Sequence, residues 1–596
     1  MLNSALNLVR IMEYSVKIIK SKDRLNNLTT FPVPSSIVDF SDENYFSSEK
    51  LKNLNTDDAL SKAFKCHSEG NTDEAYIYYK YCIEKGLTDP RIFINFGIIL
   101  KNDGRLKEAE IITRKAIKLK PDSADAYCNL GNILYDLKNL EKAKESILEA
   151  IKLRPKFSEA YFNFANILKD QGKLDEAENV IREAIQIKPS LAMAHCCLSG
   201  ILQELGNLKD AEIAIRKAIE INPNYSIALA NLGSILLDLG QLKEAEYTLL
   251  KSIEKDINLA KSYFMLSTLN TMPNGLNWQE YLFSKGILKN RNNADLIDIY
   301  FARSNILHKQ NQYEESSKYL QLANNLKLKI FPSNKKKLLL QSQSIYDHYQ
   351  KEYLENDDSF MENIFIVGMP RSGSTLVESI ISMNPNVFAL GESNIFEESL
   401  EEYKRLKREN YQSNLSKIYC SIIRKYTSQS KISTNKCLYN YLYIGKIASA
   451  INNAKIVHCF RNPLDNILSI YRANFAKGNE YSSSLIDCAE VYLNQDEIMR
   501  RYKLNYGLNI YNLNYDLLVM NPNYEIRALI AWLEWSWDDA YLCPHFNQRT
   551  ISTASTVQVR SPINNKSVGG WKNYKKLLQP AIDIIMKSNH YRGLVI

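Results

Sequence analysis

The sequence has no hydrophobic run long enough to cross a membrane. Polar or charged residues interrupt every apolar stretch, including those at the start of the chain, MLNSALNLVRIMEYSVKIIKSK. Because a spanning helix needs about 20 consecutive apolar residues, we expect no membrane segment, and we see no signal peptide. The ten cysteines form no C-x-x-C pair and no ligand spacing, which argues against a disulfide framework and against a metal site. We therefore expect a cytoplasmic, metal-free protein.

A large excess of charge of one sign is also lacking. The chain has 75 Lys and Arg against 67 Asp and Glu, a net charge of +8. This excess is too small to indicate a nucleic-acid partner, and the basic run from Lys335 to Lys337 is interpreted as a solvated helix face. At 596 residues the chain is too long for one core, so two or more domains are expected.

Internal repetition organises the first half of the chain. Small residues recur every 34 positions, at Ala75, Ala109, Ala143, Ala177, Ala211 and Ala245, and so do Pro121, Pro155, Pro189 and Pro223. Gly70, Gly104, Gly172, Gly206 and Gly240 mark turns with the same spacing, and Lys138 takes that place once. This is the period of tetratricopeptide (TPR) repeats, pairs of helices that stack into a solenoid with a concave face.

Asparagines recur at one position of the first helix of these repeats, at Asn95, Asn129, Asn163 and Asn231, with Cys197 interrupting the series. Their amides can present hydrogen bonds to an extended peptide backbone. They can equally bridge helices within the array, and the sequence does not distinguish the two roles.

The repeat register is lost after about Leu269, and a degenerate pair returns near Tyr300 to Leu328. We divide the chain into an N-terminal extension (1–55), a TPR superhelix (56–270), an irregular helical segment with one TPR-like pair (271–358) and a last domain (359–596). Strand and helix patterns alternate in the last domain: IFIV and TLVESIISM, AKIVHCF and PLDNILSIYRANFA, NIYNLNY and EIRALIAWLEW. This alternation predicts an α/β fold with a mostly parallel sheet, whose ligands lie at the carboxyl ends of the strands.

The segment IFIVGMPRSGST, from Ile364 to Thr375, carries the strongest chemical signal. It has the strand, loop and helix order of a P-loop, with Gly368 and Gly373 at the glycine positions, but Ser374 stands where the P-loop lysine should be. The positive charge has moved to Arg371, whose planar guanidinium suits an oxyanion. This pattern disfavours ATP hydrolysis and favours another anhydride.

FIVGMPRSGSTL resembles the 5'-phosphosulfate loop of sulfotransferases that use 3'-phosphoadenosine 5'-phosphosulfate (PAPS), and its arginine form is similar to that of tyrosylprotein sulfotransferases. From about Leu60 onward the chain resembles bacterial proteins with TPR repeats fused to such a domain. The resemblance implies that Arg371, Ser372, Gly373, Ser374 and Thr375 hold the donor. It also implies that Glu392, in GES after the short strand NVFAL, is the catalytic base.

Four further assignments rest on the same resemblance. Arg461 and Ser469 in RNPLDNILS correspond to the 3'-phosphate motif, with Arg472 next to the place of another family arginine. The C-terminal loop contributes Ser555, Arg560, Lys566, Trp571 and Lys572, although Gly570 stands where relatives carry Arg or Lys. Lys436 matches a lysine that neutralises the transferring group, with Leu438 replacing a frequent proline, and Tyr515 matches a nucleotide contact.

The sequence thus predicts in-line sulfuryl transfer from PAPS, without a metal, to a hydroxyl acceptor. We expect this acceptor to be tyrosine or another residue of a peptide or protein bound with help of the TPR array. Three alternatives stay open: an ATP-dependent kinase, a non-catalytic TPR scaffold that binds a nucleotide, and a variant with His458 or His545 as the base. The sequence leaves the oligomeric state undetermined.

Overall fold

The computed structural model describes residues 54–269, 278–348, 361–411, 413–427, 430–475, 478–547, 549, 553 and 556–593. The predicted extension, 1–55, lies almost wholly outside these ranges. The chain divides into two compact units, residues 1–228 and 229–596. No helix among the described residues is both long and apolar enough to cross a membrane.

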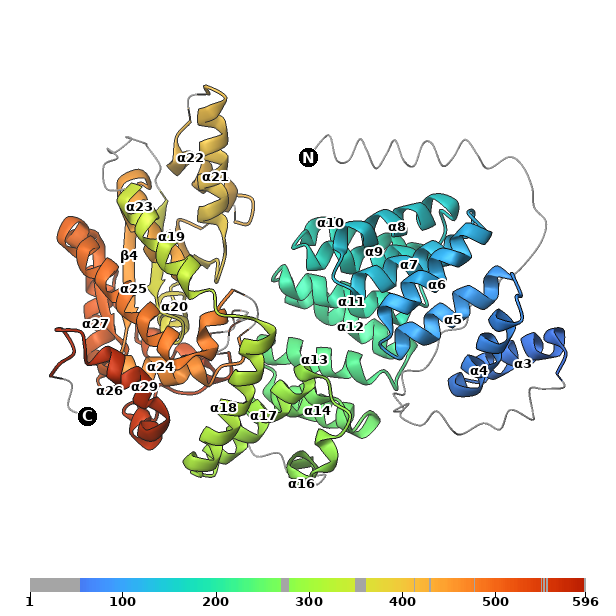
Figure 1. Cartoon of the computed structure of the whole chain (residues 1–596). Helices are drawn as coiled ribbons and strands as arrows, with labels where there is room; N and C mark the ends of the chain where they lie inside the picture. The colour runs from blue at the N-terminus through green and yellow to red at the C-terminus, as the bar shows by residue number, and fades with distance from the viewer. Residues whose placement is uncertain are drawn as a thin grey trace. The chain divides into compact units, whose positions relative to one another are not determined.

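The repeat region consists of paired helices that follow one another along the chain (Figure 1). Their bounds are α3 Thr56–Ser68, α4 Thr72–Glu84, α5 Pro90–Asn102, α6 Leu106–Leu119, α7 Ala124–Asp136, α8 Leu140–Leu153, α9 Ser158–Asp170, α10 Leu174–Ile187, α11 Ala192–Glu204, α12 Leu208–Ile221, α13 Ser226–Leu239, α14 Leu242–Lys255 and α15 Ala260–Thr268. The predicted all-helical TPR solenoid is confirmed.

Small residues let the two helices of a repeat approach closely. The repeating alanines, such as Ala109 and Ala143, are completely buried, and a Cβ added to Gly131 of α7 would overlap the side chain of Ile147 in α8. The turns between paired helices have positive φ, 76° at Gly104 and 62° at Lys138, so Lys138 adopts the left-handed conformation expected of glycine.

Three members of the asparagine series have hydrogen-bond partners within the chain, and Asn231 Oδ1 accepts from Lys261 Nζ at 3.0 Å. Asn95 is 2% exposed and its amide donates to the hydroxyl of Tyr79, 3.1 Å away. Asn163 donates to Cys128 Sγ in the preceding repeat at 3.3 Å. At these positions the amides bridge helices, which is the second of the two roles that the sequence left open.

Helices continue after the repeats as α16 Trp278–Phe283, η1 Gly286–Leu288, α17 Asn293–Lys309, α18 Tyr313–Ile330 and α19 Lys335–His348. The pair α17 and α18 matches the predicted degenerate repeat, and Asn311 in its turn has φ 61°. Lys335 is not simply solvated, because its Nζ pairs with Asp487 at 2.9 Å and Glu490 at 2.5 Å.

The last domain is built on a five-stranded sheet with the order β2-β3-β1-β4-β5. All neighbouring strands pair in parallel, as the sequence predicted: β1 Glu362–Gly368, β2 Val387–Ala389, β3 Ile432–Asn435, β4 Ala454–Phe460 and β5 Ile510–Asn514. The short strand β3, ISTN, was not predicted. Its four residues are too few to show a periodicity.

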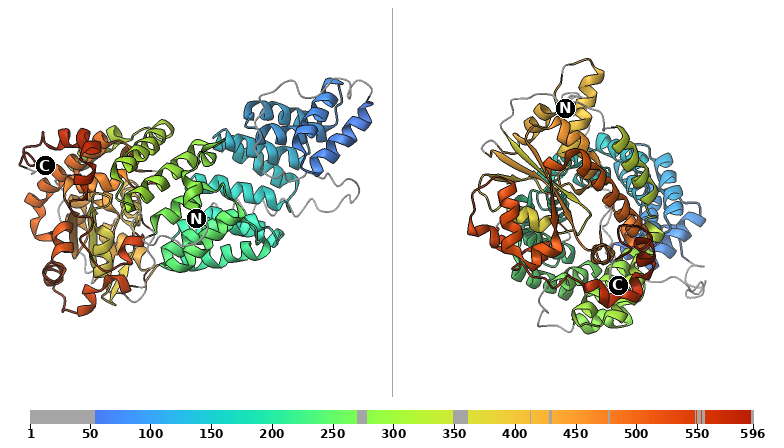
Figure 2. Two further views of the ribbon diagram at one scale, coloured as in Figure 1. Left: turned by 90° about the horizontal axis from the view of Figure 1, so that it is seen from below. Right: turned by 90° about the vertical axis from the view of Figure 1, so that its left-hand side faces the viewer.

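Helices cover both faces of this sheet (Figure 2). Ile364 and Ile366 of β1 pack with α20 and α27, whereas Phe365 and Val367 pack on the opposite face with α21, α22 and α25. The elements are α20 Ser374–Ile381, α21 Ile395–Arg408, α22 Leu415–Ile423, η2 Leu438–Tyr443, α23 Ile444–Ala450, α24 Pro463–Tyr471, η3 Glu480–Ser483, α25 Leu485–Tyr506, η4 Gly507–Asn509, α26 Tyr515–Met520, α27 Pro522–Trp532, η5 Asp539–Leu542, η6 Pro544–Phe546, α28 Thr556–Val559, η7 Gly570–Tyr574 and α29 Lys575–Ile585.

Candidate functional site

The carboxyl ends of the five strands lie at one edge of the sheet, and a predicted site residue follows each of them. The glycine loop and α20 follow β1, Glu392 follows β2, Lys436 follows β3, Arg461 follows β4 and Tyr515 follows β5. The strand order reverses its direction of growth at β1, so the glycine loop sits at a topological switch point. Ligands of open parallel sheets bind at such points.

Both glycines of the loop are required by close packing. A Cβ at Gly368, which has φ 143°, would overlap the carbonyl of Cys459 at the end of β4, and one at Gly373, with φ 94°, would overlap the ring of Tyr515. Arg371 has φ 66°, an uncommon value for a residue with a side chain. Ser372 is 1% exposed and its hydroxyl has no hydrogen-bond partner among the described residues.

Three arginines gather beside this loop. Burial together with the charges of Arg461 and Arg472 lowers the pKa of Arg371 to about 10, so Arg371 lies within the electrostatic reach of both other arginines. Arg371 Nε donates to Ser469 Oγ at 3.1 Å, and its Nη2 donates to Gln558 Oε1 at 2.7 Å. Both acceptors are uncharged. An anion at this edge would relieve the repulsion among the arginines.

Arg461 is 6% exposed and lies over the ring of Tyr515, with 4.8 Å from Cζ to the ring centroid. Its Nη2 donates to the carbonyl of Ser567 at 2.9 Å. Its ion pairs with Asp465 and Asp516 measure 4.0 and 3.7 Å, which is longer than a hydrogen bond, and its buried Nε has no hydrogen-bond partner among the described residues. Arg461 therefore retains donor capacity toward an anion.

Asp465 fixes the C-terminal loop, a role that the sequence did not indicate. Its two carboxylate oxygens accept from the backbone N–H groups of Gly569 at 2.7 Å and Trp571 at 2.9 Å. Gly569 has φ 72°, and the Trp571 side chain is 2% exposed against the core. Burial raises the pKa of Asp465. The loop is thus held next to Arg461 by a carboxylate four residues further along the chain.

Four other residues of the C-terminal loop are predicted to bind the donor or act in catalysis, and those that the structure describes make no hydrogen bond or ion pair with Asp465 or Arg461. The side chains of Lys566 and Lys572 are exposed. Arg560 donates to the carbonyls of Asn547 and Arg549 at 2.5 and 2.7 Å, so in this structure its guanidinium binds main chain. Ser555 lies outside the described residues. The donor-binding and catalytic roles of these four residues stay predictions.

Glu392 and Lys436 meet directly. Lys436 Nζ donates to Glu392 Oε1 at 2.6 Å, and the backbone N–H of Lys436 donates to the carbonyl of Gly391 at 2.8 Å. The Lys436 side chain is 1% exposed, whereas that of Glu392 is 50% exposed. A buried ammonium group therefore positions a carboxylate that faces solvent, which is the access an acceptor hydroxyl needs.

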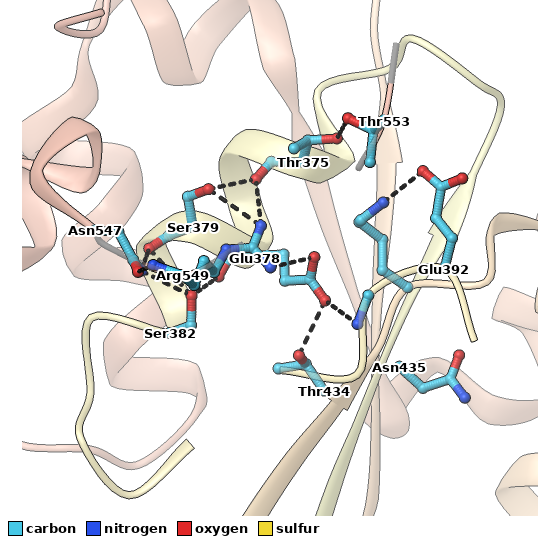
Figure 3. A network of polar contacts seen from close by, with 12 residues as sticks. Thr375, Glu378, Ser379, Ser382, Glu392, Thr434, Asn435, Asn547, Arg549 and Thr553 are labelled. Carbon is cyan, nitrogen blue, oxygen red and sulfur yellow. Dashed lines mark hydrogen bonds and ion pairs between the residues drawn. The ribbon is translucent and has the colours of Figure 1, made fainter. Parts of the chain in front are cut away.

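A buried carboxylate absent from the predicted set, Glu378, connects this pair to the helix that follows the glycine loop (Figure 3). Glu378 lies in α20, is completely buried, and pairs with Arg549 Nη1 at 2.7 Å. Its Oε1 accepts from Thr434 Oγ1 at 3.1 Å and from the N–H of Gly391 at 3.2 Å. Burial raises the pKa of Glu378, but Arg549 and Lys436 outweigh that effect, so the net shift is downward.

The sequence does contain a signal for Glu378. It is the one charged residue in the apolar helix TLVESIISM, where a buried carboxylate needs a cationic partner. Arg549 gave no such signal, because it follows α20 by more than 160 positions in an irregular segment, and only the fold brings it to Glu378.

The two histidines considered as alternative bases lie in different elements. His458 lies in β4 and is 1% exposed, and its Nε2 is 2.9 Å from Gln495 Nε2 in α25. Burial lowers the pKa of His458 to about 3, so it remains neutral inside the domain. His545 lies in η6 and its Nδ1 has no hydrogen-bond partner among the described residues.

Arg472 caps the end of α24 at Tyr471, so the predicted helix PLDNILSIYRANFA stops earlier than expected. Arg472 Nη1 donates to His308 Nε2 of α17 at 3.1 Å. His308 Nδ1 is 2.8 Å from the hydroxyl of Tyr574, and burial with the charges of Arg472 and Lys309 lowers the pKa of His308 to about 3. A neutral histidine of the TPR-like pair therefore holds the third arginine.

The residues at this edge suit an anion. Ser372 Oγ, Arg461 Nε and Arg472 Nε are buried donors without hydrogen-bond partners in the described part of the chain. Such groups are costly unless a ligand or water satisfies them. Within the same part, no group of three or more His, Cys, Asp or Glu side chains is arranged to hold a metal ion.

Comparison with known proteins agrees with this geometry. Residues 363–539 match the sulfotransferase family. Tetratricopeptide repeat families match at 90–123, 124–157, 147–179, 194–225, 214–247 and 297–329. The last of these ranges covers α17 and α18.

Individual relatives cover only parts of the chain. An "Uncharacterized protein" of Aquifex aeolicus (strain VF5) is 29% identical over 244 residues, which is 38% of this chain, and the chain spans 32% of the length of that curated relative. Among solved structures, YrrB, described as a TPR protein with an unusual peptide-binding site, is 20% identical with a TM-score of 0.25, covering 31% of this chain and 95% of its own. A thermophilic TPR protein in Thermus thermophilus is 17% identical with a TM-score of 0.29, covering 31% of this chain and all of its own. By its family matches, the chain combines tetratricopeptide repeats with a domain that matches the sulfotransferase family.

Proposed function

We propose that this protein is a PAPS-dependent sulfotransferase that transfers a sulfuryl group to a hydroxyl of a peptide or protein. One observation carries the proposal: a glycine loop without the P-loop lysine, the arginines Arg371, Arg461 and Arg472, and the Glu392–Lys436 pair lie at the same strand edge of a domain that matches the sulfotransferase family. The first two features supply an anion site, and the third supplies a base with a cationic neighbour.

The donor is assigned to the arginine side of the edge. The N–H groups at the start of α20, with Arg371 and the hydroxyls of Ser372, Ser374 and Thr375, would hold the 5'-phosphosulfate. Arg461 and Ser469, with Arg472 nearby, would hold the 3'-phosphate. Tyr515 and Trp571 would contact the rest of the nucleotide. These residues would therefore select a nucleotide with a 3'-phosphate, which AMP and ATP lack.

The sulfuryl-transfer step is assigned to the Glu392–Lys436 side of the strand edge. PAPS supplies a sulfuryl group on a good leaving phosphate. Glu392 removes the proton of the acceptor hydroxyl through Oε2, since its Oε1 is engaged by Lys436. The acceptor oxygen forms a bond to sulfur as the bond from sulfur to the 5'-phosphate oxygen breaks, and the bisphosphate leaves with the electron pair. Lys436 stabilises the charge on the transferring group, an effect of about 3 kcal/mol for a well-placed donor.

A peptide acceptor fits the repeats. TPR arrays bind proteins or peptides, and α10, α11 and α12 enclose a cavity of about 820 Å³. Ile185, Leu198, Leu202 and Ile213 give it apolar walls, and Arg182 and Glu220 supply charge. The resemblance to tyrosylprotein sulfotransferases makes tyrosine the first acceptor to test, with serine and threonine hydroxyls next.

The test is calorimetric titration with 3'-phosphoadenosine 5'-phosphate, AMP and ATP, without and with magnesium, followed by transfer of labelled sulfate from PAPS to a tyrosine peptide library. We expect tight binding of the bisphosphate alone, independent of magnesium, and labelled peptide. Preferential, magnesium-dependent binding of ATP would replace the proposal with a kinase. Bisphosphate binding without transfer to any hydroxyl would leave a nucleotide-binding scaffold.

A further inference from the structure

A second cavity lies between the TPR-like helices and the domain that matches the sulfotransferase family. Its volume is about 320 Å³, at the lower end of the ~300–1,000 Å³ range of small-ligand sites. Helices α17 and α18 form one wall, and Asn474 and Phe475 after α24, together with η3, form the other. Its lining residues are Ala294, Ile297, Asp298, Lys327, Phe331, Asn474, Phe475, Glu480 and Ser483.

The polar side of this cavity contains an unsatisfied hydroxyl. Ser483 is 3% exposed, and its Oγ has no hydrogen-bond partner among the described residues. Glu480, three positions earlier in η3, lines the same cavity. A buried hydroxyl without a partner is costly, and a ligand that hydrogen-bonds with it removes that cost.

The side-chain amide of Asn474 lies between Asp298 and Lys327 and hydrogen-bonds with both. Asn474 Nδ2 donates to Asp298 Oδ1 at 2.9 Å, and Lys327 Nζ donates to Asn474 Oδ1 at 3.0 Å and to the carbonyl of Phe475 at 2.5 Å. Burial raises the pKa of Asp298 to about 6 and lowers that of Lys327 to about 8. Both groups are thus poorly solvated, so a charged ligand interacts strongly with them.

The lining residues carry a net negative charge. The carboxyls of Asp298 and Glu480 stand against the single ammonium group of Lys327. Lys261 and Asp295 also act on Asp298 from outside the lining, with opposite signs. The remaining wall is apolar, because Ile297, Phe331 and Phe475 flank the carboxyls. A ligand that fits this surface has one positive charge on a short apolar stem.

We infer that this cavity binds an alkylammonium or guanidinium group, with the cation against Asp298, Glu480 and Ser483 and its stem between Ile297, Phe331 and Phe475. The same chemistry occurs in a free alkylamine and in a lysine or arginine side chain of a polypeptide. The site is independent of sulfuryl transfer. It is nevertheless linked to the strand edge, because Asn479, next to Glu480, accepts from the hydroxyl of Tyr439 at 2.6 Å, and Tyr439 follows Lys436 by three positions.

The inference is tested on the full chain by saturation-transfer NMR with four probes: n-butylammonium, Nα-acetyl-lysine methylamide, Nα-acetyl-arginine methylamide and the uncharged Nα-acetyl-norleucine methylamide. We expect a cationic probe to bind at least about tenfold more tightly than the norleucine probe, as charge-assisted hydrogen bonds require. Binding of butylammonium as tight as that of the amino-acid probes would identify a free amine. Preference for the amino-acid probes would identify a polypeptide side chain.

Variants complete the test. Asp298→Asn and Glu480→Gln should each weaken cation binding about tenfold, whereas Glu398→Gln, an exposed acid on α21, should leave it unchanged. Binding of 3'-phosphoadenosine 5'-phosphate, measured on every variant, reports whether the domain is folded and separates this site from the proposed donor site. If Asp298→Asn misfolds, the inference is tested by cation binding to Glu480→Gln and by the difference in affinity between the lysine and norleucine probes. Equal binding of all four probes, or cation binding unchanged in both acid variants, would overturn the inference.

Discussion

The two sides of the strand edge handle charge differently. On one side, Glu378, Glu392, Lys436 and Arg549 balance two negative charges with two positive ones, through contacts of 2.6 and 2.7 Å. On the other, Arg371, Arg461 and Arg472 lie together. The two aspartates nearest Arg461 accept hydrogen bonds from the backbone: Asp516 from the N–H of Asn462, and Asp465 from the N–H groups of Gly569 and Trp571.

Under the proposed function, the balanced side would carry the catalytic base and the arginine side would bind the donor. The balanced side has its contacts in place without a ligand, which suits the proposed role of Glu392 as a general base. The arginine side keeps an excess of positive charge that a dianionic ligand would neutralise. Substitutions on the first side should therefore change turnover or stability, and substitutions on the second should change donor affinity.

The largest effect is expected for Glu392→Gln. The amide keeps the shape of the side chain but cannot take a proton, so kcat should fall by about 10² to 10⁴ while affinity for the bisphosphate stays the same. The measurement is the rate of labelled sulfate transfer at saturating substrates, with Glu398→Gln as the matched control. Unchanged turnover would move the base elsewhere, and His545→Ala would then be the next variant to assay.

Glu378→Gln should mainly reduce stability. The substitution leaves the Arg549 guanidinium buried without its carboxylate, which costs about 3 to 5 kcal/mol in the free energy of unfolding. Because the pKa of Glu378 is lowered in the folded state, the carboxylate stabilises the protein above the unfolded-state pKa, and this contribution is lost as pH falls through the folded-state value. Urea unfolding at neutral and at acidic pH measures both effects.

A stability difference between wild type and Glu378→Gln that stays constant on acidification would contradict the assignment of charge to Glu378. The exposed acid Glu401, replaced by Gln, is the matched control, and its free energy of unfolding should change by less than about 0.5 kcal/mol.

Arg461→Ala should weaken binding of 3'-phosphoadenosine 5'-phosphate about 10² fold, since it removes charge-assisted hydrogen bonds from a buried guanidinium. Binding of AMP, which lacks the 3'-phosphate, should change much less. Calorimetry with both ligands measures the ratio, and Arg500→Ala on α25 is the control arginine. An equal loss for both nucleotides would assign Arg461 to the 5' side or to the fold.

The smallest effect is expected for His308→Ala. It removes the acceptor of Arg472 Nη1 but leaves the arginine in place, so affinity for the bisphosphate should fall less than about tenfold. Tyr574→Phe, which removes the hydroxyl on the other side of the imidazole, should act in the same direction. A loss as large as that of Arg461→Ala would make the TPR-like pair an essential part of the donor site.

The sequence by itself determined the repeats, the parallel sheet and the position of the site. A 34-residue period and alternating strand and helix patterns are local signals, and parallel strands necessarily bring their carboxyl ends to one edge. Glu392, Arg461 and Tyr515 could be placed there because each follows a predicted strand.

Only the tertiary structure decided which charges meet. Arg549 reaches Glu378, and His308 reaches Arg472 across 164 positions of sequence. Asp465 turned out to hold the C-terminal loop, and Arg560 to donate to the main-chain carbonyls of Asn547 and Arg549. No local pattern encodes such pairs, because a buried charge selects its partner by distance and desolvation after the helices and loops have packed.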